Sequence, residues 1–103
     1  MKILHRTDDL MGRVRLDSRW QNAGAEVIKK EDGEAPGMIV LDLQVKDAMA
    51  TLKHLRESYP EAELVVYGPH VEGEALKEAK AAGADLVVAR GKVAAKVLAR
   101  LGG

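Results

Sequence analysis

Five short apolar runs, separated by longer segments of other character, limit the folds that this chain can adopt. The runs are KIL at 2–4, AEVI at 25–28, MIVLDL at 38–43, ELVVY at 63–67 and DLVVA at 85–89. Most of the segments between and after them repeat apolar residues every three or four positions, which is the spacing of one helix face. Alternating strand and helix patterns predict βα units around a parallel sheet.

The helical spacing predicts helices over 10–23, 47–59, 72–82 and 92–101. The connection KEDGEAPG, between the second and third apolar runs, has only about eight residues, fewer than the dozen that a helical crossover needs. We therefore expect a loop there. The predicted fold is α/β: a doubly wound five-stranded parallel sheet of order 2-1-3-4-5, with the helix between strands 2 and 3 shortened or missing.

Composition excludes several classes of function. Sixteen basic and sixteen acidic residues cancel, so no overall charge attracts nucleic acid or an anionic membrane. The chain has no cysteine, three aromatic residues, and no apolar run near the ~20 residues that span a bilayer. We expect a single domain, 1–103, that is cytoplasmic and binds neither nucleic acid nor membranes.

Asp42 interrupts an apolar run at the end of the third predicted strand. In the predicted strand order, Asp42 and the pair Asp8 and Asp9 converge at the carboxyl edge of the sheet, where such folds bind ligands. Clustered carboxylates favour Mg²⁺, and an aspartate so placed can accept a phosphoryl group. The alternative is ordinary helix capping, in which Thr7, Asp8 or Asp9 accepts backbone N–H groups.

These residues resemble the receiver domain of two-component response regulators. The resemblance covers essentially all 103 residues, through the βα order, DD near the N-terminus, IVLD ending strand three and AAGADLVVAR leading through strand five. It implies that an acidic pair holds Mg²⁺ and that Asp42 is the phosphorylated residue. The pair corresponds either to Thr7 and Asp8 or to Asp8 and Asp9.

Other positions depart from the receiver pattern. The hydroxyl residue expected at the end of strand four is Gly68, and the lysine expected at the end of strand five is Arg90, with Lys92 close by. Arginine is a larger planar fork that does not simply replace an ammonium group. The aromatic residue expected on strand five is Val87, and the proline expected after the aspartate is Lys46. This pattern indicates a degenerate receiver, or pseudo-receiver.

The expected function is therefore a receiver-like signalling or regulatory domain that binds a protein partner. We expect no enzymatic activity, no required cofactor and no conventional phosphorylation switching. Two alternatives remain open. One is a Mg²⁺-dependent phosphoacceptor on Asp42, with Arg90 or Lys92 replacing the lysine. The other is a small-anion or nucleotide binder at the same crevice.

Other polar residues give weaker indications of function. His70 is a candidate general base or pH-sensitive contact near the crevice, although a loop histidine is more often solvated. His5 and His54 are expected to be structural or surface residues. The basic residues of the first helix are expected to form a solvated face: Arg13, Arg15 and Arg19.

The short second connection also bears on assembly. Without a covering helix, Val27 or Ile28 of strand two would leave apolar surface open to water, and a two-fold homodimer would bury it. The alternative is that the loop folds back and covers the patch itself.

Overall fold

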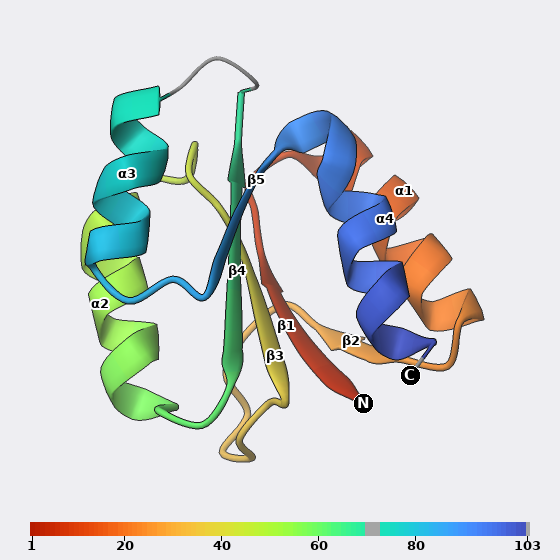
Figure 1. Ribbon diagram of the computed structural model, residues 1–103. Coiled ribbons are helices and arrows are strands. Elements are labelled where there is room, and N and C mark those ends of the chain that lie inside the picture. Colours follow the sequence, from red (N-terminus) through yellow and green to blue (C-terminus); the bar gives the residue numbers. More distant parts are fainter. Residues whose placement is uncertain (70–72, 103) are drawn as a thin grey trace.

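The computed structural model describes residues 1–69 and 73–102. Within them the elements are β1 Lys2–Arg6, α1 Leu10–Asn22, β2 Glu26–Ile28, β3 Met38–Asp42, α2 Ala48–Ser58, β4 Glu63–Gly68, α3 Gly73–Ala81, β5 Leu86–Ala89 and α4 Arg90–Leu101 (Figure 1). All the predicted strands and helices are present within a few residues of their expected bounds. In the described part of the chain, no helix is long and apolar enough to cross a membrane.

The strands form one parallel sheet in the order β2-β1-β3-β4-β5, which confirms the predicted topology. Helices α1 and α4 cover one face of the sheet, and α2 and α3 cover the other (Figure 1). Strand β3 lies in the centre, and all five of its residues are buried. Both faces of the sheet are covered, which explains why the strands are nearly continuous apolar runs.

Side chains along each strand alternate between two hydrophobic cores. On β1, Ile3 packs in the core under α1 and α4, whereas Leu4 packs in the core under α2 and α3. On β3, Val40 belongs to the first core and Leu41 to the second. Because this alternation has a period of two residues, a polar side chain on an inner strand enters one particular core.

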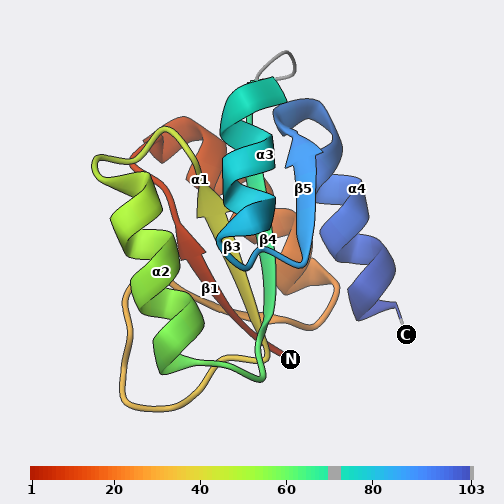
Figure 2. The ribbon, with the colours of Figure 1, turned by 60° about the vertical axis from the view of Figure 1, so that its left-hand side comes forward.

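The connection between β2 and β3 is a loop, as its length predicts (Figure 2). Its acidic residues attach it to the body of the domain. Lys2 Nζ on β1 donates to Asp32 Oδ1 at 2.6 Å, and the Tyr59 hydroxyl after α2 donates to Glu31 Oε1 at 2.7 Å. These two contacts hold the loop against β1 and against the end of α2.

Val27 and Ile28 are half-buried on opposite faces of the sheet. Each packs against the core on its own side. Both the homodimer and the alternative, in which the loop covers these residues, remain predictions.

Turns and caps follow the sequence with one exception. Asp9 is the N-cap of α1, where its Oδ1 accepts the Gly12 N–H at 3.1 Å. Gly24 and Gly83, in the AGA sequences at 23–25 and 82–84, have φ of 99° and 119°, which side-chain-bearing residues rarely adopt. An Asp at an N-cap position usually accepts a backbone N–H, but Asp47, the N-cap residue of α2, has φ of 55° and its side chain accepts no capping hydrogen bond.

Candidate functional site

Asp42 lies at the carboxyl end of β3 and is only 2% exposed. Its Oδ2 accepts the Thr7 hydroxyl hydrogen at 2.7 Å, and its Oδ1 accepts the Gln44 N–H at 2.9 Å. Thr7 directly follows Arg6, which pairs with Leu41 in the β1–β3 register, so Thr7 is placed opposite Asp42. A buried carboxylate is tolerated when its lone pairs are satisfied in this way.

Arg90 supplies the positive charge next to Asp42. It is the first residue of α4, directly after β5, and its Nη2 lies 3.4 Å from Asp42 Oδ1 while its Nη1 lies 3.5 Å from Asp9 Oδ2. Nη2 also donates to Gln44 Oε1. The guanidinium carbon sits 5.5 Å from the centroid of the Tyr67 ring, within the range of a cation–π contact. A cation from the chain itself thus lies between two carboxylates.

The donor set does not fit a divalent cation in this arrangement. Both oxygens of Asp42 hold hydrogen bonds, and Asp9 caps α1 while facing Arg90. Asp8 is exposed. Across residues 1–69 and 73–102, no three His, Asp or Glu side chains are grouped to hold a metal ion. Asp9 and Asp42 lie at the same edge of the sheet, as expected, and the Arg90 side chain contacts both of them. Asp8, Asp9 and Asp42 do not form a three-carboxylate metal site.

Two of the remaining predicted site residues, Gly68 and Lys92, belong to elements that end or begin at this edge. Gly68 ends β4 and pairs with Ala89 in the β4–β5 register. A Cβ atom added to Gly68 would lie 3.6 Å from Leu43 Cδ1, an ordinary van der Waals distance, so the missing hydroxyl reflects the residue type and not a lack of space. Lys92 is exposed on the first turn of α4. His70 lies outside the described residues.

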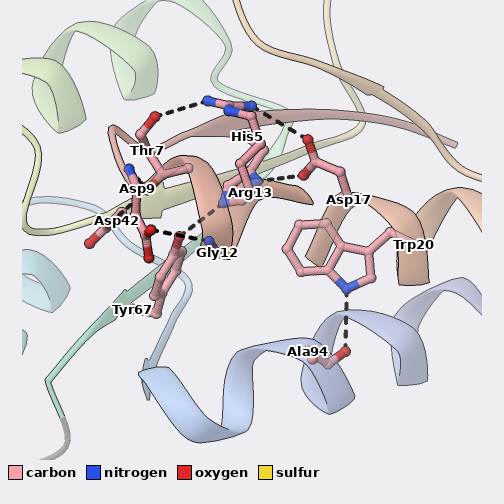
Figure 3. A network of polar contacts seen from close by, with 10 residues as sticks. All are labelled: His5, Thr7, Asp9, Gly12, Arg13, Asp17, Trp20, Asp42, Tyr67 and Ala94. Atoms are coloured by element: carbon pink, nitrogen blue, oxygen red, sulfur yellow. Dashed lines mark hydrogen bonds and ion pairs between the residues drawn. The ribbon is translucent and has the colours of Figure 1, made fainter. Parts of the chain in front are cut away.

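A buried polar network continues from this edge into the core under α1 and α4 (Figure 3). His5 is fully buried, with Nδ1 at 2.6 Å from Asp17 Oδ1 and Nε2 at 2.9 Å from the Tyr67 hydroxyl. Arg13 Nη1 lies 3.5 Å from Asp17 Oδ2, and its Nη2 donates to the Thr7 carbonyl at 3.0 Å. The network thus joins α1 to the end of β1.

Sequence reasoning missed this network. The sequence predicts His5 to be structural or on the surface, and the structure shows it completely buried between two polar partners. The prediction that Arg13 lies on a solvated face is wrong because Arg13 is 8% exposed, whereas Arg15 and Arg19 are exposed as expected. The four-residue spacing of Arg13 and Asp17, typical of helical ion pairs, was the available indication.

Tyr67 connects the buried network with the edge. Burial raises the pKa of its hydroxyl to about 12; the negative charge of Asp42 adds to this, and the Thr7 side chain and Arg90 act against it. Trp20 packs edge-on against the His5 ring with centroids 5.1 Å apart, and its Nε1 donates to the Ala94 carbonyl of α4 at 3.3 Å. The polar groups are therefore enclosed by α1 and α4.

Close to the site, the outer surface of α1 is unusually apolar. Leu10, Met11 and Val14 are 74%, 75% and 67% exposed, and together with Arg15 they line an open hollow of about 450 Å³. A second hollow, lined by Asp9, Met11, Arg90 and others, connects this surface to the edge that holds Asp42.

Several solved structures that match this chain are response regulators. A receiver domain protein from Clostridium thermocellum matches with a TM-score of 0.84 and 15% identity over 98% of this chain and 90% of that chain. The receiver domain of NtrX from Brucella abortus matches with a TM-score of 0.81 and 20% identity over 96% of both chains. The chain has the receiver-domain fold.

A third match with the receiver fold is a response regulator from Burkholderia pseudomallei, solved with a phosphorylated aspartic acid, calcium ion and citrate, at a TM-score of 0.81 and 19% identity. The chain spans 65% of that protein and 26% of a Brucella abortus NtrX chain solved with ADP. Protein-family models and curated protein sequences give no match.

Proposed function

We propose that this chain is a cytoplasmic signalling or regulatory domain that binds a protein partner and does not switch by conventional phosphorylation. The observation that carries the proposal is the placement of Arg90. Its guanidinium group lies against both Asp42 and Asp9, where a phosphoryl-accepting site would need a free carboxylate oxygen and a mobile cation. The receiver fold supports the assignment to signalling.

Phosphorylation of Asp42 would disturb several contacts at once. The attacking oxygen would have to leave either Thr7, or Gln44 and Arg90, and the product would place further negative charge at a position that is 2% exposed. Gly68 offers no hydroxyl group to a phosphoryl oxygen. These features together favour a single stable arrangement of the side chains at this edge, whereas a phosphorylation switch would need two.

The exposed apolar surface of α1 supports a protein partner. Contiguous exposed apolar side chains commonly mark interaction sites, and Leu10, Met11 and Val14 form such a group. Arg15 lines the same hollow, and Arg90 lines the neighbouring one. A partner with apolar side chains next to carboxylates would complement this surface.

The test is mass spectrometry of the intact chain after incubation with acetyl phosphate and Mg²⁺. The wild-type chain is expected to remain unmodified. The double variant Gly68→Thr with Arg90→Lys restores the hydroxyl and the lysine of the receiver pattern and is expected to gain one phosphoryl mass, lost again when Asp42→Asn is added. Gly68→Ala with Arg90→Lys is the matched control, because it adds the Cβ without the hydroxyl.

Stoichiometric modification of the wild-type chain, abolished by Asp42→Asn, would contradict the proposal. It would favour the alternative in which Asp42 is a Mg²⁺-dependent phosphoacceptor and Arg90 or Lys92 replaces the missing lysine.

A second candidate function, binding of a small anion or nucleotide, has one observation in its favour. An open cleft of about 520 Å³ beside the edge is lined by Arg6, Thr7, Asp8, Arg13, Lys29, Lys30 and Glu31. Four of these seven side chains are basic. Titration with inorganic phosphate and with ADP, followed by amide chemical shifts, tests it: saturable shifts at Lys29 and Lys30 support this candidate, and unchanged spectra remove it.

A further inference from the structure

A cleft of about 520 Å³ opens at the carboxyl edge of the sheet, beside the ends of β1 and β2. Its walls come from the end of β1 and the residues after it, from α1, and from the segment that follows β2. The lining residues are Arg6, Thr7, Asp8, Arg13, Lys29, Lys30 and Glu31. All of them are charged or carry a hydroxyl group, and a cleft of this size accommodates a small organic molecule.

One wall of the cleft is held in place by contacts inside the domain. Arg13 is buried, its Nη2 donates to the Thr7 carbonyl at 3.0 Å, and its Nη1 lies 3.5 Å from Asp17 Oδ2. Thr7 is also buried, and its hydroxyl donates to Asp42 Oδ2 at 2.7 Å. This wall is therefore formed before any ligand arrives, which lowers the cost of binding one.

Three cations of the cleft are available to a ligand. Leu4 pairs with Ile28 in the β1–β2 register, so Arg6 and Lys30, each two positions farther along, come to the same edge. Among residues 1–69 and 73–102, no side-chain hydrogen bond or ion pair involves Arg6, Lys29 or Lys30. Their positive charges converge on one cleft from two neighbouring strands, which favours an anion there.

The two carboxylates of the cleft differ in what they already contact. Glu31 accepts the Tyr59 hydroxyl hydrogen at 2.7 Å through Oε1, and its Oε2 lies 3.1 Å from His54 Nε2. Asp8 is exposed, and within the described part of the chain its side chain has no hydrogen-bond partner. An ionised carboxylate only accepts hydrogen bonds, so Asp8 suits a hydroxyl group of a ligand and repels a phosphate group.

We propose that this cleft binds the phosphate monoester of a hydroxylated, non-aromatic molecule, such as a sugar phosphate. The proposal rests on the second candidate function, the binding of a small anion in this cleft, and names the chemical class of that anion. Arg6, Lys29 and Lys30 hold the phosphate group, and Asp8 accepts hydrogen bonds from the hydroxyl groups. A nucleotide fits less well, because no apolar or aromatic side chain lines the cleft to contact its base.

The test is a titration of the isotopically labelled full chain, followed by amide chemical shifts, with glucose 6-phosphate, ribose 5-phosphate, glucose, inorganic phosphate, pyrophosphate and ADP. At least one sugar phosphate is expected to shift Lys29 and Lys30 and to bind at least about fivefold more tightly than inorganic phosphate, because its hydroxyl groups add hydrogen bonds. Glucose alone is expected to leave both signals unchanged. ADP is expected to bind no more tightly than pyrophosphate, which carries the same two phosphate groups without a base.

Variants separate the phosphate contacts from the hydroxyl contacts. Asp8→Ala is expected to strengthen the binding of inorganic phosphate, because a like charge is removed, and to abolish the advantage of the sugar phosphate, because its hydroxyl groups lose their acceptor. Lys29→Gln with Lys30→Gln is expected to weaken the binding of both compounds by at least about fivefold. Lys46→Gln is the matched control, because Lys46 is exposed in the connection after β3 and does not line the cleft.

Three results would overturn the proposal: sugar phosphates that bind no more tightly than inorganic phosphate, an Asp8→Ala variant that keeps the full advantage of the sugar phosphate, or ADP that binds more tightly than pyrophosphate. Saturable binding of inorganic phosphate without a preference for sugar phosphates would overturn this proposal and leave anion binding in place. Asp8, Lys29 and Lys30 are exposed, so their variants are expected to keep the fold, and none of these results depends on phosphorylation of Asp42.

Discussion

Alkaline unfolding of this domain should depend on Tyr67. Its side chain is 1% exposed, and burial raises its pKa from 10.0 to about 12. In the unfolded chain the hydroxyl ionises near its ordinary pKa of about 10. Because the folded pKa is the higher one, the associated stability is present in full below pH 10 and is lost as the pH rises toward 12. A difference of about two units corresponds to about 2.7 kcal/mol.

The measurement is urea unfolding at several pH values between 9 and 12, followed by the fluorescence of the buried Trp20. Other groups also titrate in this range, so the informative quantity is the difference in unfolding free energy between wild type and Tyr67→Phe. That difference should fall by up to about 2.7 kcal/mol across the range. Near neutral pH, Tyr67→Phe should already cost about 1–3 kcal/mol, because His5 loses a buried partner.

Parallel stability curves for wild type and Tyr67→Phe from pH 9 to 12 would refute this reasoning. Tyr59→Phe is the comparison variant, because it removes the other tyrosine and leaves Tyr67 in place. The Tyr59→Phe variant should still lose stability as the pH rises from 9 to 12, because it retains Tyr67.

Three further outcomes can be measured by urea unfolding. Arg56 donates to four backbone carbonyl oxygens and to Asp85. Arg56→Ala should therefore lower the free energy of unfolding by about 2–3 kcal/mol, and Arg56→Lys should recover only part of this loss. An unchanged stability in Arg56→Ala would contradict this prediction. Gly83→Ala should cost at least about 1 kcal/mol more than Gly24→Ala, because both have positive φ but only the Gly83 Cβ would meet Arg56 Cδ, at 2.8 Å. Equal losses would show that Arg56 moves aside freely. The hydrogen bond from the Leu64 N–H, and then Arg56, lower the pKa of Asp85 in the folded chain. The Asp85 carboxylate should therefore stabilise the fold above pH 4, and this stabilisation should be lost as the pH falls through the lowered pKa. The difference in unfolding free energy between wild type and Asp85→Asn should accordingly shrink between pH 6 and 2.5. A constant difference would exclude this assignment.

Most of the fold could be predicted because each inner strand is buried on both faces. Residues 38–41 form an unbroken apolar run for that reason, and the eight-residue connection before them is too short for a covering helix. The position of Asp42 at the edge followed from the same strand, since a charge next to a buried run is tolerated only where it is paired or reaches water.

The contacts of Asp42 could not be predicted in the same way. Arg90 lies 48 positions later, and it reaches Asp42 only because α4 begins directly after β5 without an intervening loop. The partner of His5 on β4 lies 62 positions away. Strand order brings such positions to one edge or one core, but side-chain pairing across the sheet depends on register and on rotamers that composition and spacing do not specify.

The strand order also has a consequence for how the chain folds. Every pair of neighbouring strands is joined by a long connection; the partners nearest in sequence, such as Val65 and Leu86, are 21 positions apart, and Ile3 pairs with Met38, which is 35 positions later. No hairpin can form early and guide the rest, because all strand pairs are parallel. The entropy of closing these loops must be overcome before any pairing contributes, and mixed α/β domains of this kind fold more slowly than helical bundles. The central strand β3 contributes to both cores. During synthesis the sheet can therefore assemble around β1 and β2 only after residues 38–42 have been made.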